Sequence, residues 1–162
     1  MDNQTIKPTG CCEPFDPEPW QDKEITWNDK LFVKDRVISF LHIPLNFGQK
    51  VVKNMKLIEA VSAKSEYQLM LTDEKSPWGT DIYISVSRNV PDAQMATLSG
   101  TFLTKVFEGP YRNAGQWAEM MKKYVVDKNK NLKKLYFSYT TCPRCAKAYG
   151  KNYVILFAQI NQ

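Results

Sequence analysis

Four cysteines form the most distinctive chemical pattern in this sequence. Cys11 and Cys12 are adjacent near the start, and a CPRC motif near the end contains Cys142 and Cys145. Thiolates two residues apart in a tight turn are a common donor pair for Zn²⁺. With Cys11 and Cys12 as the remaining ligands, the site would have four sulfurs and would anchor the N-terminal segment. The sequence therefore indicates these four cysteines as candidate metal ligands and zinc as a candidate cofactor.

The same cysteines allow other interpretations. Because adjacent cysteines fit one tetrahedral ion poorly, one of them could act with His42 or water instead. A redox motif of the thioredoxin type would need a long helix after the CPRC motif, and Gly150 indicates a turn there instead. Unpaired structural thiols or a disulfide are the plainest alternatives. A cysteine nucleophile such as Cys142 could be activated by His42, the one histidine of the chain, or by nearby lysines.

A carboxylate and a phenol flank the turn that connects a predicted strand with the second predicted helix. The sequence from Phe102 to Trp117 ends a strand at Gly109-Pro110 and begins a helix after Asn113. Glu108 precedes that turn and Tyr111 follows it. A buried Glu108 could act as a general base, because desolvation raises the pKa of a carboxyl. The alternative is a solvated turn carboxylate. Asp81, before another strand, is the next candidate.

Aromatic side chains are candidates for binding a small molecule. Aromatic residues make up 12% of the chain. Those in turns have fewer packing duties and are better placed to contact a ligand. Helical spacing of Trp117 with Met121 indicates core packing instead. The ligand-binding candidates, together with Glu108, are Trp20, Trp78, Tyr83, Tyr111 and Tyr139.

Strand and helix patterns alternate in a repeated order. Helices are predicted for residues 46–60 and 113–127 from apolar residues at helical spacing. Strands are predicted for residues 31–45, 67–72, 81–87, 95–107, 135–139 and 153–160, the last of them central. Residues 75–79 are expected to form a turn. Four prolines between residues 8 and 19 indicate that residues 1–30 are irregular.

The order predicts an α+β fold of duplicated β-α-β-β units. The sequences NFGQ and NAGQ begin the two predicted helices, which supports halves of about 31–90 and 95–162. We expect an antiparallel sheet with two helices on one face and a concave site between the halves. The domain would span residues 31–162, with residues 1–30 as an extended arm packed on it.

This order and the motif FEGPY, residues 107–111, resemble the GyrI-like small-molecule-binding superfamily. More narrowly, the sequences CCEPFDPEPW, FLHIPLNFG, WGTDIYI and TTCPRCAKAYGKNYV are similar to small bacterial proteins loosely labelled hydrolases. The resemblance implies an aromatic cleft for small, often cationic or hydrophobic molecules. It also implies a glutamate on a late strand in many members. This chain has no acidic residue after Asp127, so no residue here matches that glutamate.

Composition and charge limit the kinds of partner that this protein is expected to bind. The chain is 43% hydrophobic and 24% charged, as in ordinary globular domains. The formal net charge is +5, and its densest basic run lies at 122–134 without a nucleic-acid-binding motif, so nucleic acid is not an expected partner. No apolar run is long enough for a transmembrane helix, and no secretory leader is evident. A cytoplasmic location without a membrane partner is therefore expected.

The sequence predicts a stand-alone protein that binds a small hydrophobic or aromatic molecule and carries a cysteine cluster as a candidate zinc site. The alternative is a hydrolase acting on a small hydrophobic substrate in the same cleft. Its catalytic group would be Glu108, Cys142 with His42, or a metal-bound water.

Overall fold

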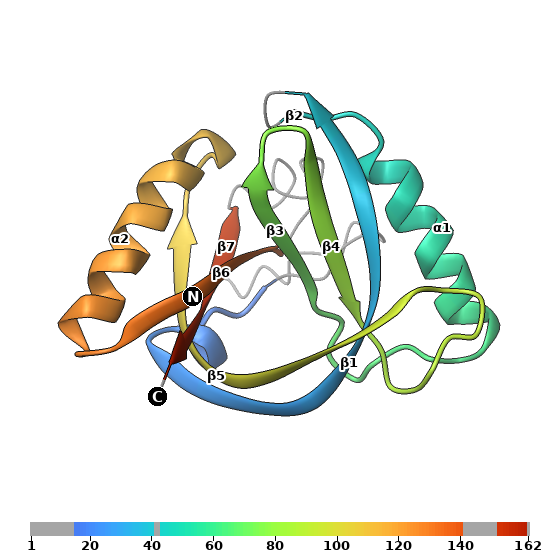
Figure 1. Ribbon diagram of the computed structural model, residues 1–162, viewed down its shortest axis with the longest axis horizontal. Coiled ribbons are helices and arrows are strands. Elements are labelled where there is room, and N and C mark those ends of the chain that lie inside the picture. The colour runs from blue at the N-terminus through green and yellow to red at the C-terminus, as the bar shows by residue number, and fades with distance from the viewer. Residues whose placement is uncertain (1–14, 41–42, 141–151, 162) are drawn as a thin grey trace, which may run out of the picture. The chain divides into compact units, whose positions relative to one another are not determined.

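The computed structural model describes residues 15–40, 43–140 and 152–161 of the 162-residue chain. The elements, with η marking 3₁₀ turns, are η1 (Glu18–Trp20), β1 (Lys23–Phe40), β2 (Ile43–Pro44), α1 (Phe47–Ala60), β3 (Met70–Ser76), β4 (Gly79–Ser85), β5 (Met95–Glu108), η2 (Tyr111–Asn113), α2 (Ala114–Asp127), β6 (Asn131–Tyr139) and β7 (Tyr153–Asn161) (Figure 1). The predicted α+β class is confirmed, and so is the predicted order of helices and strands, with β2 added. That the halves are copies of one unit stays a prediction.

The described residues form two compact units, each with one helix. The first, here called the α1 unit, consists of residues 26–101 and 136–138. The second, the α2 unit, consists of the described residues within 1–25, 102–135 and 139–162. β1, β5 and β6 each contribute residues to both units.

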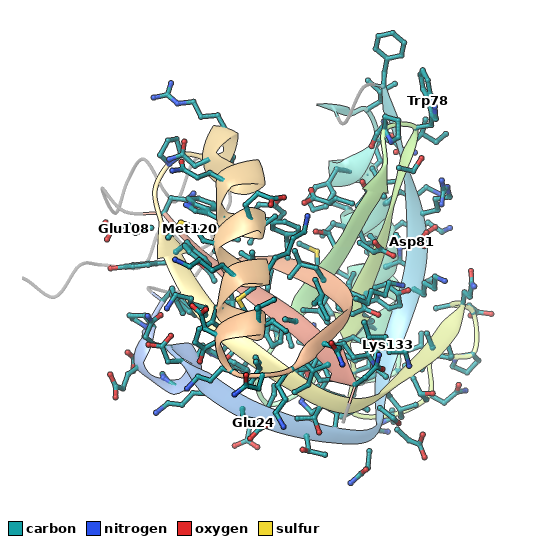
Figure 2. The ribbon with its side chains drawn as sticks, turned by 60° about the vertical axis from the view of Figure 1, so that its left-hand side comes forward. Glu24, Trp78, Asp81, Glu108, Met120 and Lys133 are labelled. Carbon is teal, nitrogen blue, oxygen red and sulfur yellow. The ribbon has the colours of Figure 1, made fainter. Side chains whose placement is uncertain are left out.

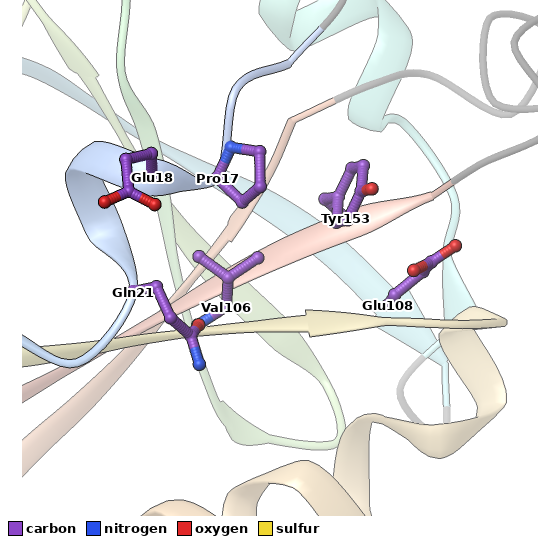
Figure 3. A pocket seen from close by; sticks show the side chains of 6 residues that line it. All are labelled: Pro17, Glu18, Gln21, Val106, Glu108 and Tyr153. Atoms are coloured by element: carbon purple, nitrogen blue, oxygen red, sulfur yellow. The ribbon is translucent and has the colours of Figure 1, made fainter.

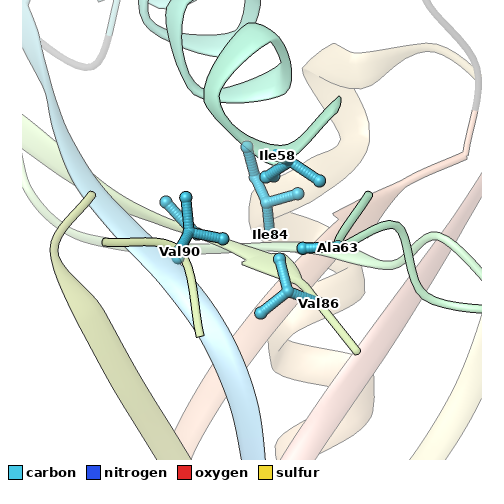
Figure 4. Packing of buried hydrophobic residues seen from close by; sticks show 6 residues of the cluster. Ile58, Ala63, Ile84, Val86 and Val90 are labelled. Atoms are coloured by element: carbon cyan, nitrogen blue, oxygen red, sulfur yellow. The ribbon is translucent and has the colours of Figure 1, made fainter. Parts of the chain in front are cut away.

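A sheet with α1 on one face makes up the α1 unit. Its strand order is β2-β1-β4-β3, followed by residues 136–138 of β6. β1 and β4 are antiparallel, with Phe32 opposite Ser85 and Ile38 opposite Gly79. Ile58 of α1 packs into a buried apolar cluster on the sheet (Figure 4). The cluster consists of Val33, Ile58, Ala63, Ile84, Val86 and Val90. Because side chains alternate along a strand, the residues next to Val33 and Ile84 point to the opposite face.

Strand β7 is the centre of the α2 unit. It lies between β6 and β5, and its residues 154–160 are buried, which confirms the prediction of a central strand. Helix α2 packs on β7 and buries Trp117, Met121 and Val125, the spacing expected of one helical face. Trp117 also stacks on Phe107 of β5, with ring centroids 5.8 Å apart. The prediction that Trp117 is a packing residue is confirmed.

The prediction that residues 1–30 are irregular is wrong for the last eight of them. β1 begins at Lys23, four residues after the last proline of this segment. Ile25 and Trp27 are half-buried and alternate with exposed neighbours, as in a strand with one covered face. Trp27 packs on Phe32, with centroids 5.8 Å apart. The proline-rich composition hid this short alternating pattern.

Two smaller predictions also need correction. The turn predicted at residues 75–79 is shorter, because β3 continues to Ser76 and β4 begins at Gly79. Asn46 and Asn113 lie at the predicted helix starts, but each comes just before its helix and neither side chain caps it. The Asn46 Oδ1 atom instead accepts a hydrogen bond of 2.8 Å from the backbone N–H of Ile38. Asn46 therefore ties the helix start to β1.

Candidate functional site

Aromatic rings gather on the sheet face of the α1 unit that is turned away from α1. Phe32 of β1 and Tyr83 of β4 meet edge to face, with centroids 6.2 Å apart and planes at 89°. Tyr83 meets Tyr136 of β6 in the same way, at 5.8 Å and 88°. Tyr83 is 4% exposed and Phe32 fully buried. These three residues are called the aromatic face below.

Charged side chains border the aromatic face. Lys34 of β1 lies opposite Tyr83, and its Nζ atom is 5.5 Å from the centroid of the Tyr83 ring. The same Nζ is 3.9 Å from Oδ2 of Asp81. Arg36 places Nη1 3.3 Å from Oδ1 of Asp81, and its guanidinium lies against Gly79. The one carboxylate of Asp81 is therefore shared by two cations.

Two exposed aromatic rings lie at the end of the β3–β4 hairpin. Trp78 is 58% exposed and Phe40 is 54% exposed, and their rings meet at 5.9 Å. The backbone supports this contact, since Ser39 N–H donates a 2.9 Å hydrogen bond to Trp78 O. Figure 2 shows Trp78 at the end of the hairpin and Asp81 farther along it. The predicted position of Trp78 in a turn is confirmed, while a ligand contact stays a prediction.

Asp35 is held by a polar network on the face covered by α1. Its Oδ2 accepts a 2.8 Å hydrogen bond from the buried Asn54 side chain, and Lys50 Nζ lies 3.4 Å from Oδ1. Burial alone would raise the pKa of Asp35. The hydrogen bonds from Asn54 and from the backbone of Arg36, together with Lys50, outweigh burial and lower that pKa below its ordinary value. The carboxylate is stabilised in its charged form and serves to join α1 to β1.

Glu108 borders an open surface pocket of the α2 unit, of about 290 Å³. The lining residues are Pro17, Glu18, Gln21, Val106, Glu108 and Tyr153 (Figure 3). The two carboxylates lie on different sides of the pocket, with the Tyr153 ring on its wall. Glu108 is exposed, which corresponds to the predicted alternative of a solvated carboxylate. Such a pocket has room for a small polar or cationic group.

The other predicted aromatic residues of the α2 unit have packing partners. Tyr111 of η2 and Tyr139 of β6 are half-buried and meet edge to face at 5.3 Å. Trp20 of η1 meets Phe157 at 5.5 Å, and its backbone oxygen accepts a 2.7 Å hydrogen bond from Thr104 Oγ1. These contacts give each ring a structural role, and their contact with a ligand stays a prediction.

The described residues of the predicted site are divided between the two units. Trp78 and Tyr83 belong to the α1 unit, whereas Trp20, Glu108, Tyr111 and Tyr139 belong to the α2 unit. Cys11, Cys12, His42, Cys142 and Cys145 lie outside the described residues. Among residues 15–40, 43–140 and 152–161, no group of three or more His, Cys, Asp or Glu side chains is placed to hold a metal ion. Neither helix in this part of the chain is long and apolar enough to cross a membrane.

The sequence alone did not identify Phe32 and Tyr136 of the aromatic face, or Lys34 at its border. Phe32 and Lys34 alternate with Val33, so they share the face opposite the one that α1 covers. That signal was present in β1, but it identifies a surface only once the cross-strand neighbour Tyr83 is known. Tyr136 reaches the same surface from a strand far along the chain, and no local pattern indicates that contact.

Comparison with known proteins identifies the family of this chain. The bacterial hydrolase family matches residues 1–160, and the protein belongs to this family. A comparison with curated proteins gives no match.

Solved structures share the fold at low sequence identity. The C-terminal domain of EcmrR has a TM-score of 0.61 and 12% identity, over 88% of this chain and 98% of that one. A hydrolase from Listeria innocua has a TM-score of 0.63 and 13% identity, over 87% and 92%. SAV2435, solved bound to tetraphenylphosphonium, has a TM-score of 0.54 and 13% identity, over 87% and 94%. The fold is the GyrI-like fold that the sequence resemblance predicted.

Proposed function

We propose that this protein binds a small hydrophobic or aromatic molecule, and that the aromatic face of the α1 unit provides part of the binding surface. The observation that carries the proposal is the edge-to-face row of Phe32, Tyr83 and Tyr136 on the sheet face opposite α1. Aromatic walls with a few polar groups at their border are typical of small-molecule sites. The likeness to SAV2435, which was solved with an aromatic ligand, supports the same class of function.

The proposed site depends on an internal duplication of the chain. We propose that residues 31–90 and 95–162 are two copies of one unit, because each contributes one helix and, apart from the short β2, the same order of strands. In this proposal the binding site is an aromatic cleft between the two copies. Trp20, Trp78, Tyr111 and Tyr139 would be further ligand contacts.

Calorimetric titration with a neutral aromatic probe, triphenylphosphine oxide, tests the proposed function. Tyr83→Leu removes the ring but keeps apolar bulk, and an aromatic contact contributes about 0.5–1.5 kcal/mol. We expect the Kd to rise roughly three- to tenfold. Tyr67→Leu is the control, because Tyr67 is 49% exposed and belongs to the same unit. No binding by the folded wild-type protein would reject the proposal.

Hydrolysis is the second candidate function. The family description and the position of Glu108 at a pocket favour it. In the reaction, Glu108 would remove a proton from the attacking water, or Cys142 would attack with His42 as its base. An ester and amide panel compared between wild type and Glu108→Gln tests the first route, since general base catalysis contributes about 10²–10⁴-fold. Glu119→Gln on the exposed face of α2 is the control, and equal turnover in all three proteins removes Glu108 from catalysis.

Zinc binding by Cys11, Cys12, Cys142 and Cys145 remains part of the proposal. The support is the spacing of the cysteines in the sequence. A cytoplasmic location, which we also propose, would keep these thiols reduced. Elemental analysis with thiol counting on native and denatured protein is the test. Absence of stoichiometric zinc together with four reactive thiols in the native protein would reject the metal site.

A further inference from the structure

Lys34 contacts both groups that would attract a cation to the aromatic face, the Tyr83 ring and the neighbouring Asp81 carboxylate. A cation is held in an aromatic site by the face of a ring and by a nearby carboxylate. Here the Tyr83 ring has Lys34 Nζ at 5.5 Å, and the Asp81 carboxylate has the same Nζ at 3.9 Å. The chain therefore already supplies the cation that the ring and the carboxylate would bind.

Arg36 strengthens this effect, while Asp73 adds negative charge nearby. Arg36 holds the other oxygen of Asp81 at 3.3 Å, so this carboxylate faces two cations. Asp73 lies directly opposite Asp81 on β3, and it too is engaged in an interaction. A cationic ligand at Tyr83 would approach the positive charges of Lys34 and Arg36, and like charges repel most strongly at a partly dehydrated surface. An anionic ligand would meet the same two groups as partners.

We propose that Lys34 is a specificity-determining residue that excludes cations from the aromatic face and favours aromatic anions, such as aryl carboxylates or sulfonates. The inference rests on the proposed function, because it names the charge of the ligand at the same surface. Lys34 is accessible for this role, since its side chain is 31% exposed. Arg36, at 58% exposed, is a second donor that an anion at the border could reach.

The test uses two probes of the same size and shape but opposite charge, tetraphenylborate and tetraphenylphosphonium, titrated calorimetrically in sodium buffer. Their affinity ratio isolates charge from shape and apolar area. For the wild type we expect tetraphenylborate to bind about tenfold more tightly or better, which corresponds to about 1.4 kcal/mol. In Lys34→Gln we expect that preference to fall by roughly tenfold, mainly through tighter binding of tetraphenylphosphonium.

Two further variants separate the local effect from net charge. Lys64→Gln changes net charge equally, but Lys64 pairs with Glu59 at 3.3 Å and is 59% exposed, so its ratio should equal that of the wild type. Lys34→Arg keeps the charge and should keep the preference. Thermal unfolding of each variant verifies the fold.

The outcomes distinguish the two proposals. If both probes and triphenylphosphine oxide bind but Lys34→Gln leaves the ratio unchanged, or if the wild type prefers tetraphenylphosphonium, the role of Lys34 is wrong while the proposed function stands. If no probe binds the wild type or Lys34→Gln, the proposed function fails and this inference fails with it.

Discussion

The two units present tyrosine rings in opposite electrostatic surroundings. Tyr83 in the α1 unit is buried, and the charges beside it are already paired, with Lys34 and Arg36 on Asp81. Tyr153 in the α2 unit is half-buried and lies at an open pocket with Glu18 and Glu108. Among the described residues, no ion pair involves either of these glutamates. Under the proposal above, burial and internal pairing would make the first surface selective, while the carboxylates at the second are open to solvent.

The largest expected difference is the loss of folding stability when each tyrosine ring is removed. Tyr83→Ala removes a ring that is 4% exposed and meets two other rings, so it should destabilise the protein by about 3–5 kcal/mol. Tyr153→Ala removes a half-buried ring and should cost less, about 1–2 kcal/mol. Urea unfolding of both variants measures the difference. Equal losses of stability would mean that both rings are core residues, which would contradict the proposed difference between the two surfaces.

The next effect compares a networked carboxylate with a solvated one. Asp35→Asn should cost about 1–3 kcal/mol at pH 7, because it breaks a charge-assisted network with Asn54 and Lys50. Glu108→Gln should change stability by less than about 0.5 kcal/mol, as is usual for an exposed residue. Denaturant unfolding at pH 7 gives both values.

The pH dependence sharpens the Asp35 prediction. Since the pKa of Asp35 is lower in the folded than in the unfolded protein, its stabilisation is complete above the ordinary value of 3.8 and is lost as pH falls through the folded-state pKa. The stability gap between wild type and Asp35→Asn should therefore shrink below pH 3.8. A gap that stays constant down to pH 2.5 would contradict the ionic contribution of Asp35.

Two glycines, one in each unit, should differ in how well they tolerate alanine. Gly109 has φ of +145°, and a Cβ there would lie 3.3 Å from the Trp117 ring, so Gly109→Ala should cost about 1–2 kcal/mol. At Gly79 a Cβ would meet only the flexible end of Arg36, so Gly79→Ala should cost about 0.5 kcal/mol or less by displacing the guanidinium. Thermal unfolding measures both, and a larger loss at Gly79 would show that the Arg36 position is rigid.

The sequence predicted elements well where a local pattern determines them. The helical spacing of Trp117, Met121 and Tyr124 and the apolar run of β7 identify a helix and a central strand without knowledge of their neighbours. The start of β1 was missed because its alternation is short and follows four prolines. The aromatic face could not be predicted, since it depends on cross-strand register and on Tyr136, which reaches Tyr83 from a distant strand.

The smallest effect concerns exposed ion pairs, one in each unit. Arg36–Asp81 in the α1 unit has a separation of 3.3 Å, and Lys122–Glu119 in the α2 unit one of 2.8 Å. Both cations are more than half exposed, and such surface pairs contribute about 0–1 kcal/mol. Arg36→Gln and Lys122→Gln should therefore each change the free energy of unfolding by less than about 0.5 kcal/mol.

Arg36 should nevertheless differ from Lys122 in ligand binding. If the charges around Tyr83 serve ligand choice and not folding, Arg36→Gln should weaken tetraphenylborate binding by about two- to fivefold while Lys122→Gln leaves it unchanged. A stability loss above about 1 kcal/mol for Arg36→Gln would place this pair among the structural contacts of the α1 unit. The paired charges beside Tyr83 would then be a consequence of folding, and the contrast between the two tyrosine surfaces would be one of burial alone.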